Sequence, residues 1–221
     1  MRLVILGGPG AGKGTQAQPL CRHLGISEIS TSDILREAIA SKTELGRQAQ
    51  VYVEKGELVP DPILIEFMRQ RLLQDDAKGR GWLLEGYPRT AFQAEELDFL
   101  LDDLGQQLDW AIYLQVPEAV MMSRSLGRSL TSGNIKTMPS LASPDEPAPA
   151  PTLKSVAIAR DSRPDDQPEI VQRRIDLFYQ RTIPMLEYYE YRQRLLNINA
   201  DQSPDQVQQE ILAFFAGSPT P

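Results

Sequence analysis

A glycine-rich segment near the start of the chain constrains the fold most. It reads GGPGAGKGTQ over residues 7–16, after the apolar run Leu3–Leu6 and before a helical pattern. Glycines are needed where backbone N–H groups converge on a phosphate, because side chains would keep the anion away. Lys13 adds a full positive charge at the P-loop spacing, although Gly14 stands where the general motif has Ser or Thr. The segment therefore predicts a loop that binds a nucleoside triphosphate.

Further apolar runs predict a parallel sheet. Each is followed by glycine, proline or polar residues and then by a helical pattern, which is typical of α/β proteins. The five expected strands are 3–6, 26–29, 82–84, 110–114 and 195–198, and helical patterns cover 63–73, 118–126, 170–189 and 205–215. We therefore expect a three-layer α/β/α fold of the P-loop NTPase class with a parallel five-stranded sheet.

A proline-rich segment interrupts this pattern. Seven of the 17 prolines lie between residues 139 and 168. That density excludes a continuous helix or a central strand. Because the sequence on both sides looks structured, the segment is an insertion between two core elements. A disordered linker and a mobile active-site lid are both compatible with it.

Charge and cysteine content narrow the functional classes. The net charge of −7 argues against a nonspecific nucleic-acid coat and against a membrane-surface protein. The single cysteine, Cys21, excludes an internal disulfide and a multi-cysteine zinc site, and fits a reducing compartment. The apolar run at the N-terminus is too short for a signal peptide or a membrane span. We expect a cytoplasmic protein with no zinc, no nucleic-acid partner and no membrane partner.

Arginines in this acidic chain mark candidate phosphate contacts. The repulsion between two bound phosphates must be offset locally, and the planar guanidinium fork grips phosphate oxygens in pairs. Arg89 follows Gly86-Tyr87-Pro88 at the end of the strand expected over 82–84, and α/β proteins bind ligands at that end of a parallel strand. Arg124 and Arg128 are four residues apart and share a helix face. The six candidates are Arg36, Arg89, Arg124, Arg128, Arg163 and Arg174.

Taken together, these segments resemble the adenylate kinase family of nucleoside monophosphate kinases. The resemblance is carried by residues 7–18, 29–36, Gly46, 56–61, 86–90 with Gln93, 127–128 and 163–166 with Arg174, and covers nearly the whole chain except about 129–160. It implies a core formed by 1–29, 61–127 and 164–221, a monophosphate-binding insertion over 30–60, and a lid over 128–163. The proline-rich lid carries neither the cysteine cluster nor the polar network of the family's long lids.

The resemblance implies Mg²⁺-dependent, reversible phosphoryl transfer from ATP to AMP, giving two ADP, in a chain expected to be monomeric. ATP would be bound by Gly8, Pro9, Gly10, Ala11, Gly12, Lys13, Gly14, Thr15, Arg124 and Arg128. AMP would be bound by Thr31, Arg36, Glu57, Val59, Gly86, Arg89, Gln93, Arg163 and Arg174. The catalytic residues would be Lys13, Arg89, Arg124, Arg163 and Arg174.

The resemblance implies no direct protein ligand for Mg²⁺. Glu85 stands where the family usually has Asp, and would act on the ion through a bound water.

Two other functions stay open at this stage. A kinase of the same class acting on UMP or CMP is the first, although Thr31 and Gln93 favour adenine. A nucleotide-binding regulator without catalysis is the second, and Glu85 and the proline-rich lid are the features that support it. Turnover with different monophosphates separates these alternatives from an adenylate kinase.

Overall fold

The computed structural model describes residues 1–54, 59–132 and 168–217, with the side chains of 128–132 left aside. The strands are β1 (Arg2–Leu6), β2 (Ser27–Ser30), β3 (Trp82–Glu85), β4 (Trp110–Gln115) and β5 (Leu195–Asn199). The first helices are α1 (Lys13–Leu24), α2 (Thr31–Ala40), α3 (Glu44–Glu54), α4 (Asp61–Leu72), α5 (Asp75–Arg80) and α6 (Ala91–Asp103). They are followed by α7 (Glu118–Ser132), α8 (Pro168–Leu177), the π-helical turn η1 (Phe178–Thr182), α9 (Ile183–Tyr191) and α10 (Pro204–Gly217).

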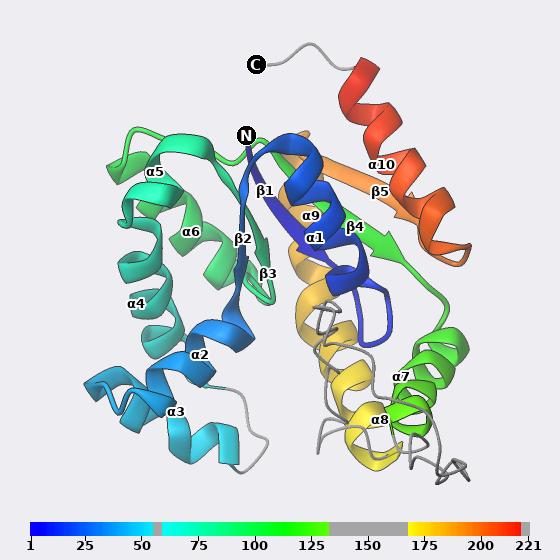
Figure 1. The fold of residues 1–221 in the computed structure, drawn as a ribbon, viewed down its shortest axis with the longest axis horizontal. Helices are drawn as coiled ribbons and strands as arrows, with labels where there is room; N and C mark the ends of the chain where they lie inside the picture. The colour runs from blue at the N-terminus through cyan, green and yellow to red at the C-terminus, as the bar shows by residue number, and fades with distance from the viewer. Residues whose placement is uncertain (55–58, 133–167, 218–221) are drawn as a thin grey trace, which may run out of the picture.

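The five strands form one sheet in the order β2-β3-β1-β4-β5, and every neighbouring pair is parallel (Figure 1). This confirms the expected α/β/α fold with a parallel five-stranded sheet. Strand ends differ from the prediction by about one residue, the usual uncertainty at element boundaries; β2, for example, covers Ser27–Ser30 where 26–29 was expected. The central position of β1 places the segment that follows it in the middle of the sheet edge.

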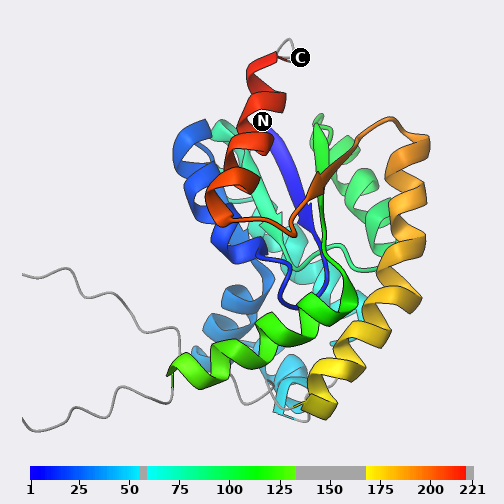
Figure 2. The same cartoon turned by 90° about the vertical axis from the view of Figure 1, so that its right-hand side faces the viewer.

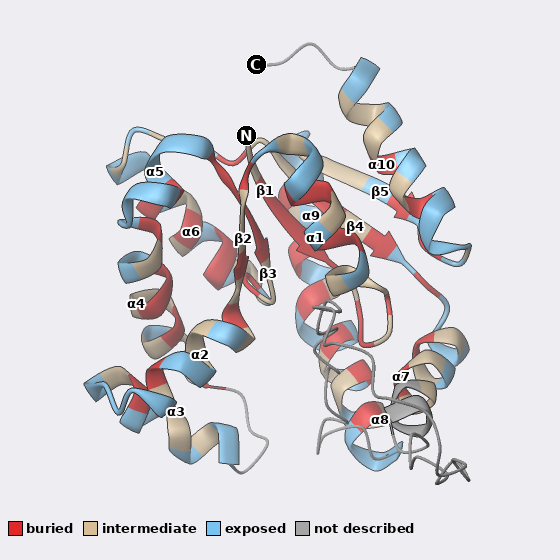
Figure 3. Cartoon of the chain, viewed as in Figure 1, coloured by how far each residue is buried: buried red, intermediate tan, exposed pale blue. Residues whose placement is uncertain are grey.

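Side chains alternate between two hydrophobic cores, one on each face of the sheet. On β1, Val4 and Leu6 belong to the core under α4, α6 and α9, whereas Leu3 and Ile5 belong to the core under α1, α8 and α10. This period of two is the pattern of a strand covered on both faces. Figure 3 shows the buried residues concentrated in the sheet and on the helix faces that cover it.

Several helices lie beyond the carboxyl ends of the strands. Helices α2 and α3 pack on each other there, and α7 packs on α8 on the other side of the view (Figures 1 and 2). Figure 2 also shows α8 and α9 as one long rod along the sheet. The pattern expected over 170–189 is therefore present, but a π-helical turn interrupts it.

No helix in the described part of the chain combines the length and the apolar character that crossing a bilayer requires.

Candidate functional site

The glycine loop, Gly7–Gly12, connects β1 to α1 and can be formed only by glycine at key positions. Gly10 and Gly12 have φ angles of +73° and +91°, which side-chain-bearing residues rarely adopt. A Cβ on Gly8 would lie 2.2 Å from Sδ of Met121, and one on Gly10 would lie 2.6 Å from the Met121 carbonyl oxygen. Because α7 packs this closely, positions 8 and 10 have no room for a side chain.

Lys13 begins α1 and turns its ammonium back onto the glycine loop. Its Nζ donates hydrogen bonds to the carbonyl oxygens of Gly7 at 2.7 Å and Gly8 at 3.0 Å. The positive end of the α1 dipole lies at the same place, because the helix starts at this residue. The loop therefore combines backbone donors, a helix N-terminus and a cation, which together bind phosphate.

Arg124 lies on α7 beside this loop. A Cβ on Gly10 would be 3.3 Å from the Cβ of Arg124. The guanidinium reaches the segment after β5, where Nη1 donates to the carbonyl oxygen of Ala200 at 2.9 Å and Nη2 lies 3.8 Å from Oδ1 of Asp201. The structure thus places the backbone end of Arg124 beside the glycine loop, while its guanidinium contacts the segment after β5.

A second loop, the Arg89 loop (Gly86–Thr90), connects β3 to α6 at the same edge of the sheet. Gly86 has a φ of +90°, and a Cβ there would lie 3.3 Å from Oγ1 of Thr31 and 3.5 Å from Nη2 of Arg89. The Nε of Arg89 donates to the Gly86 carbonyl at 2.7 Å. The structure therefore places three predicted monophosphate-site residues, Thr31, Gly86 and Arg89, side by side.

Gln93 and Thr31 hold this loop with their polar groups. The Oε1 of Gln93 accepts a hydrogen bond from the Arg89 N–H at 2.7 Å, and its Nε2 donates to Oδ1 of Asp61 at 2.6 Å. The Thr31 hydroxyl donates to the Glu85 carbonyl at 3.0 Å. Both side chains are only 3% exposed. The sequence resemblance implies that these two residues line an adenine pocket. In the structure their side chains are hydrogen-bonded to other groups of the protein.

The electrostatics of the Arg89 loop identify a neighbouring cation. The protein that surrounds Arg89 lowers the pKa of its guanidinium, although the residue still has exposed surface. The positive charge of Arg174 on α8 lowers that pKa further, whereas Glu85 raises it. An arginine stays protonated at neutral pH even so. Two cations that oppose each other's charge in this way favour an anion between them.

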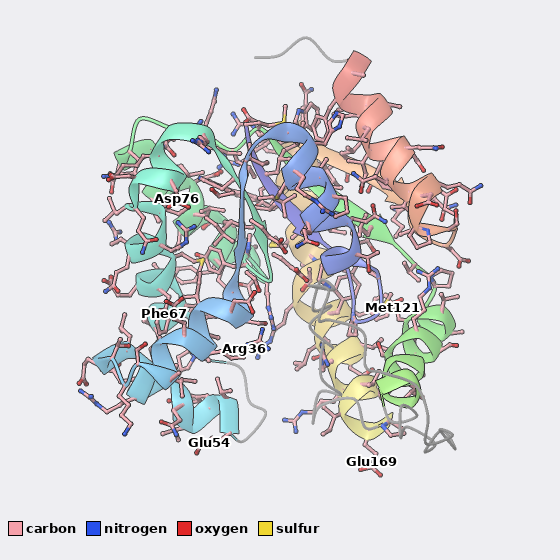
Figure 4. All side chains as sticks on the ribbon, in the orientation of Figure 1. Arg36, Glu54, Phe67, Asp76, Met121 and Glu169 are labelled. Atoms are coloured by element: carbon pink, nitrogen blue, oxygen red, sulfur yellow. The ribbon has the colours of Figure 1, made fainter. Side chains whose placement is uncertain are left out.

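Other predicted residues lie elsewhere. Arg36 is exposed on α2 and pairs with Asp33, and among the described residues no hydrogen bond or ion pair joins it to Arg89. Figure 4 shows Arg36 on α2 and Met121 on α7, on opposite sides of the lower end of the sheet. Val59 is buried before α4. Glu57, Arg163 and the side chain of Arg128 lie outside the described residues.

Glu85 is the carboxylate that the sequence resemblance assigns to magnesium. It ends β3 and pairs in register with Ile5, one residue before the last residue of β1, so it lies next to the glycine loop. Within the described ranges no three His, Cys, Asp or Glu residues gather into a metal site. Mg²⁺ is commonly held by one carboxylate, waters and substrate phosphates. The donor set therefore suits an ion that arrives with a nucleotide.

Sequence reasoning missed two residues of this site. Asp61 ends the segment 56–61 that contributed to the family resemblance, but its hydrogen bond with Gln93 spans 32 positions of the chain. Thr182 donates to the Arg89 carbonyl at 3.1 Å across 93 positions. Residue type and local spacing give no signal of partners that lie so far away in the chain.

Comparison with known proteins agrees with this geometry. The family profile described as adenylate kinase matches residues 5–194. Adenylate kinase 2 of Nostoc sp. (strain PCC 7120) is 61% identical over 212 residues, which cover 96% of this chain and 97% of that protein. Adenylate kinase 2 of Synechocystis sp. is 51% identical over 213 residues, with coverages of 96% and 99%. The adenylate kinase of Gloeobacter violaceus is 40% identical over 215 residues, with coverages of 95% and 96%. The chain therefore belongs to the adenylate kinase family.

Proposed function

We propose that this enzyme, which transfers a phosphoryl group reversibly from ATP to AMP to give two ADP, divides the two nucleotides between its two loops. The glycine loop and Lys13 would hold the ATP phosphates, with Arg124 beside them. Arg89 and Arg174 would hold the AMP phosphate. The observation that carries this proposal is that the two loops follow neighbouring strands at one edge of the sheet: β1 leads into the glycine loop, and β3, paired with it in parallel, leads into the Arg89 loop.

The chemistry needs no covalent bond to the protein. Transfer between two phosphates is limited by their repulsion and by alignment, so fixed cations and backbone donors supply most of the catalysis. Lys13 would exchange its two carbonyl partners for phosphate oxygens. Mg²⁺ bound to ATP would neutralise charge on the phosphate chain, and Glu85 would hold that ion through water.

The remaining predicted contacts belong to this proposal. AMP would be surrounded by Thr31, Arg36, Glu57, Val59, Gly86, Gln93 and Arg163, and ATP by residues 8–15 and Arg128. Arg36 would leave its ion pair with Asp33 to reach the phosphate. Segment 30–60 would form the monophosphate-binding insertion, 128–163 the lid, and 1–29, 61–127 and 164–221 the core. The monomeric state and the cytoplasmic location stay predictions from the sequence.

Steady-state kinetics with one matched pair of variants test the proposal. Arg174 and Arg173 are adjacent on α8, but Arg173 is exposed. We expect Arg174→Ala to lower kcat/KM for AMP about 100-fold, the usual effect of removing one preorganised donor, and Arg173→Ala to change it less than twofold. Equal effects of the two substitutions would contradict the assigned role.

The choice of monophosphate is tested with AMP, dAMP, UMP and CMP at saturating Mg-ATP. We expect AMP to have the highest kcat/KM. A preference for UMP or CMP would identify a pyrimidine monophosphate kinase, and nucleotide binding without turnover would identify a regulator.

A further inference from the structure

The rod formed by α8, η1 and α9 contacts both loops of the site. Phe178, the first residue of η1, lies 3.4 Å from where a Cβ of Gly8 would be, on the glycine loop. Thr182, the last residue of η1, donates to the Arg89 carbonyl. Arg174, one turn before η1, acts electrostatically on the Arg89 guanidinium. One helical segment therefore contacts the glycine loop and the Arg89 loop, and Figure 2 shows it as one long rod along the sheet.

The π-helical turn brings these three residues onto one face. Each α-helical residue advances about 100°, so residues eight apart, such as Arg174 and Thr182, would lie about 80° apart around a regular helix. A π turn accommodates one additional residue, so this pair is placed as if seven apart, with a difference of about 20°. Phe178 lies four residues from each and shares that face.

The backbone of Arg89 is held by hydrogen bonds at both its N–H and its carbonyl group. Its N–H donates to Gln93 of α6, and its carbonyl accepts from Thr182 of η1. Thr182 is only 9% exposed, so water competes little for this hydrogen bond. The two bonds fix the orientation of the Arg89 backbone, and the backbone sets the direction in which the guanidinium leaves the chain.

We infer that Thr182 is a positioning residue for the phosphate-binding arginine, placed by the π-helical turn of η1. Its hydroxyl fixes the Arg89 carbonyl, and the same turn keeps Arg174 on the face that Arg89 approaches. This inference rests on the proposed role of Arg89 in binding the AMP phosphate. It predicts that Thr182 affects kcat/KM for AMP and leaves KM for ATP unchanged.

The test compares two substitutions that differ in one hydroxyl. Thr182→Val keeps the shape of the side chain and removes the donor, whereas Thr182→Ser keeps the donor. We expect Thr182→Val to lower kcat/KM for AMP about tenfold with KM for ATP within twofold of wild type, and Thr182→Ser to restore most of the loss. Gln180→Ala, on the exposed side of the same turn, serves as the control and should leave both constants unchanged.

A double variant separates positioning from a structural role. If Thr182 acts through the Arg89 guanidinium, Thr182→Val should have less than a twofold further effect in an Arg89→Ala background. A full tenfold effect there, or unchanged AMP kinetics of a folded Thr182→Val, would overturn the inference. Should Thr182→Val not fold, as judged by thermal unfolding, Thr182→Ala replaces it in both measurements.

The Arg89→Ala enzyme also tests the role of Arg89 separately from that of Thr182. Normal kinetics of Arg89→Ala would overturn the proposed role of Arg89, and with it this inference. Impaired Arg89→Ala beside a normal Thr182→Val would overturn the inference alone.

Discussion

The glycine loop and the Arg89 loop are both proposed to bind phosphate, but they are stabilised differently. In the glycine loop, positive φ angles and close packing of α7 shape the backbone. In the Arg89 loop, side chains of Gln93 and Thr182 hold the backbone, and Asp61 holds Gln93. The first arrangement depends on the absence of side chains and the second on their presence. The two loops should therefore fail under different substitutions, and the following predictions test that difference.

The largest expected effect is on turnover, from removing the cation of the Arg89 loop. Arg89→Ala should lower kcat/KM for AMP about 1,000-fold, because a charge that stabilises the transferring phosphoryl group is lost. The measurement is a coupled assay that varies AMP at saturating Mg-ATP. Arg69→Ala, on the exposed surface of α4, is the control for loss of positive charge, and thermal unfolding of both variants checks the fold. Near-normal turnover of Arg89→Ala would refute the role.

A single methyl group should disrupt the glycine loop. Gly10→Ala places a Cβ 2.6 Å from the Met121 carbonyl at a φ of +73°, and we expect about 2 kcal/mol lower free energy of unfolding. KM for ATP should rise at least tenfold, while KM for AMP changes little. Urea unfolding and steady-state kinetics measure the two effects. Gly79→Ala, where a Cβ meets no atom within 4 Å, should be neutral; equal behaviour of both variants would show that the loop tolerates side chains.

Removing the outer support of the Arg89 loop should have a smaller effect. Asp61→Ala takes away the acceptor of Gln93 Nε2, and one lost hydrogen bond of a buried amide corresponds to about 1 kcal/mol. We expect KM for AMP to rise about fivefold with KM for ATP unchanged. Asp61→Asn keeps an oxygen acceptor and should stay close to wild type. If both variants are equally impaired, the carboxylate charge and not the hydrogen bond supports the loop.

The last expected effect is confined to alkaline pH and concerns Cys21, which is buried on α1. Burial, with a smaller contribution from the negative charge of Glu28, raises the pKa of this thiol from 9.0 to about 12. Above pH 9 the unfolded chain therefore releases a proton that the folded chain keeps. The free energy of unfolding should fall as the pH rises from 9 towards 12.

Chemical denaturation at several pH values measures this fall, with Cys21→Ala as the matched control. The free energy of unfolding of Cys21→Ala should fall less steeply with pH, because the variant has no thiol to titrate. Burial also raises the pKa values of Tyr87 and Tyr189, but these tyrosines contribute equally to both proteins. Identical pH profiles would contradict the shielding of the thiol.

The contrast between the loops also explains what the sequence could predict. Glycines, a lysine and their spacing lie within ten consecutive residues, so the glycine loop and the strand before it were identified correctly. The order of apolar runs likewise predicted the parallel sheet, because a strand covered on both faces needs an uninterrupted apolar stretch. Locally encoded features were therefore visible.

Features that depend on partners far away in the chain could not be predicted from the sequence. The pairing of Asp61 with Gln93 and of Thr182 with Arg89 arises only when separate helices converge. The π-helical turn interrupted a pattern that the sequence presented as one helix, because apolar residues continue at spacings of three and four through the turn. Arg36 was assigned by motif, but its ion pair with Asp33 on the same helix was not foreseen.

The ammonium of Lys13 donates hydrogen bonds to the carbonyl oxygens of Gly7 and Gly8. It has therefore already exchanged part of its hydration shell for fixed protein dipoles, and its rotamer is already restricted. An incoming triphosphate replaces one set of oxygens with another that carries full charge. The protein thus fixes this cation in place, and we expect highly charged ligands to be favoured, because a weakly charged ligand gains too little from the ammonium to displace the two carbonyl oxygens.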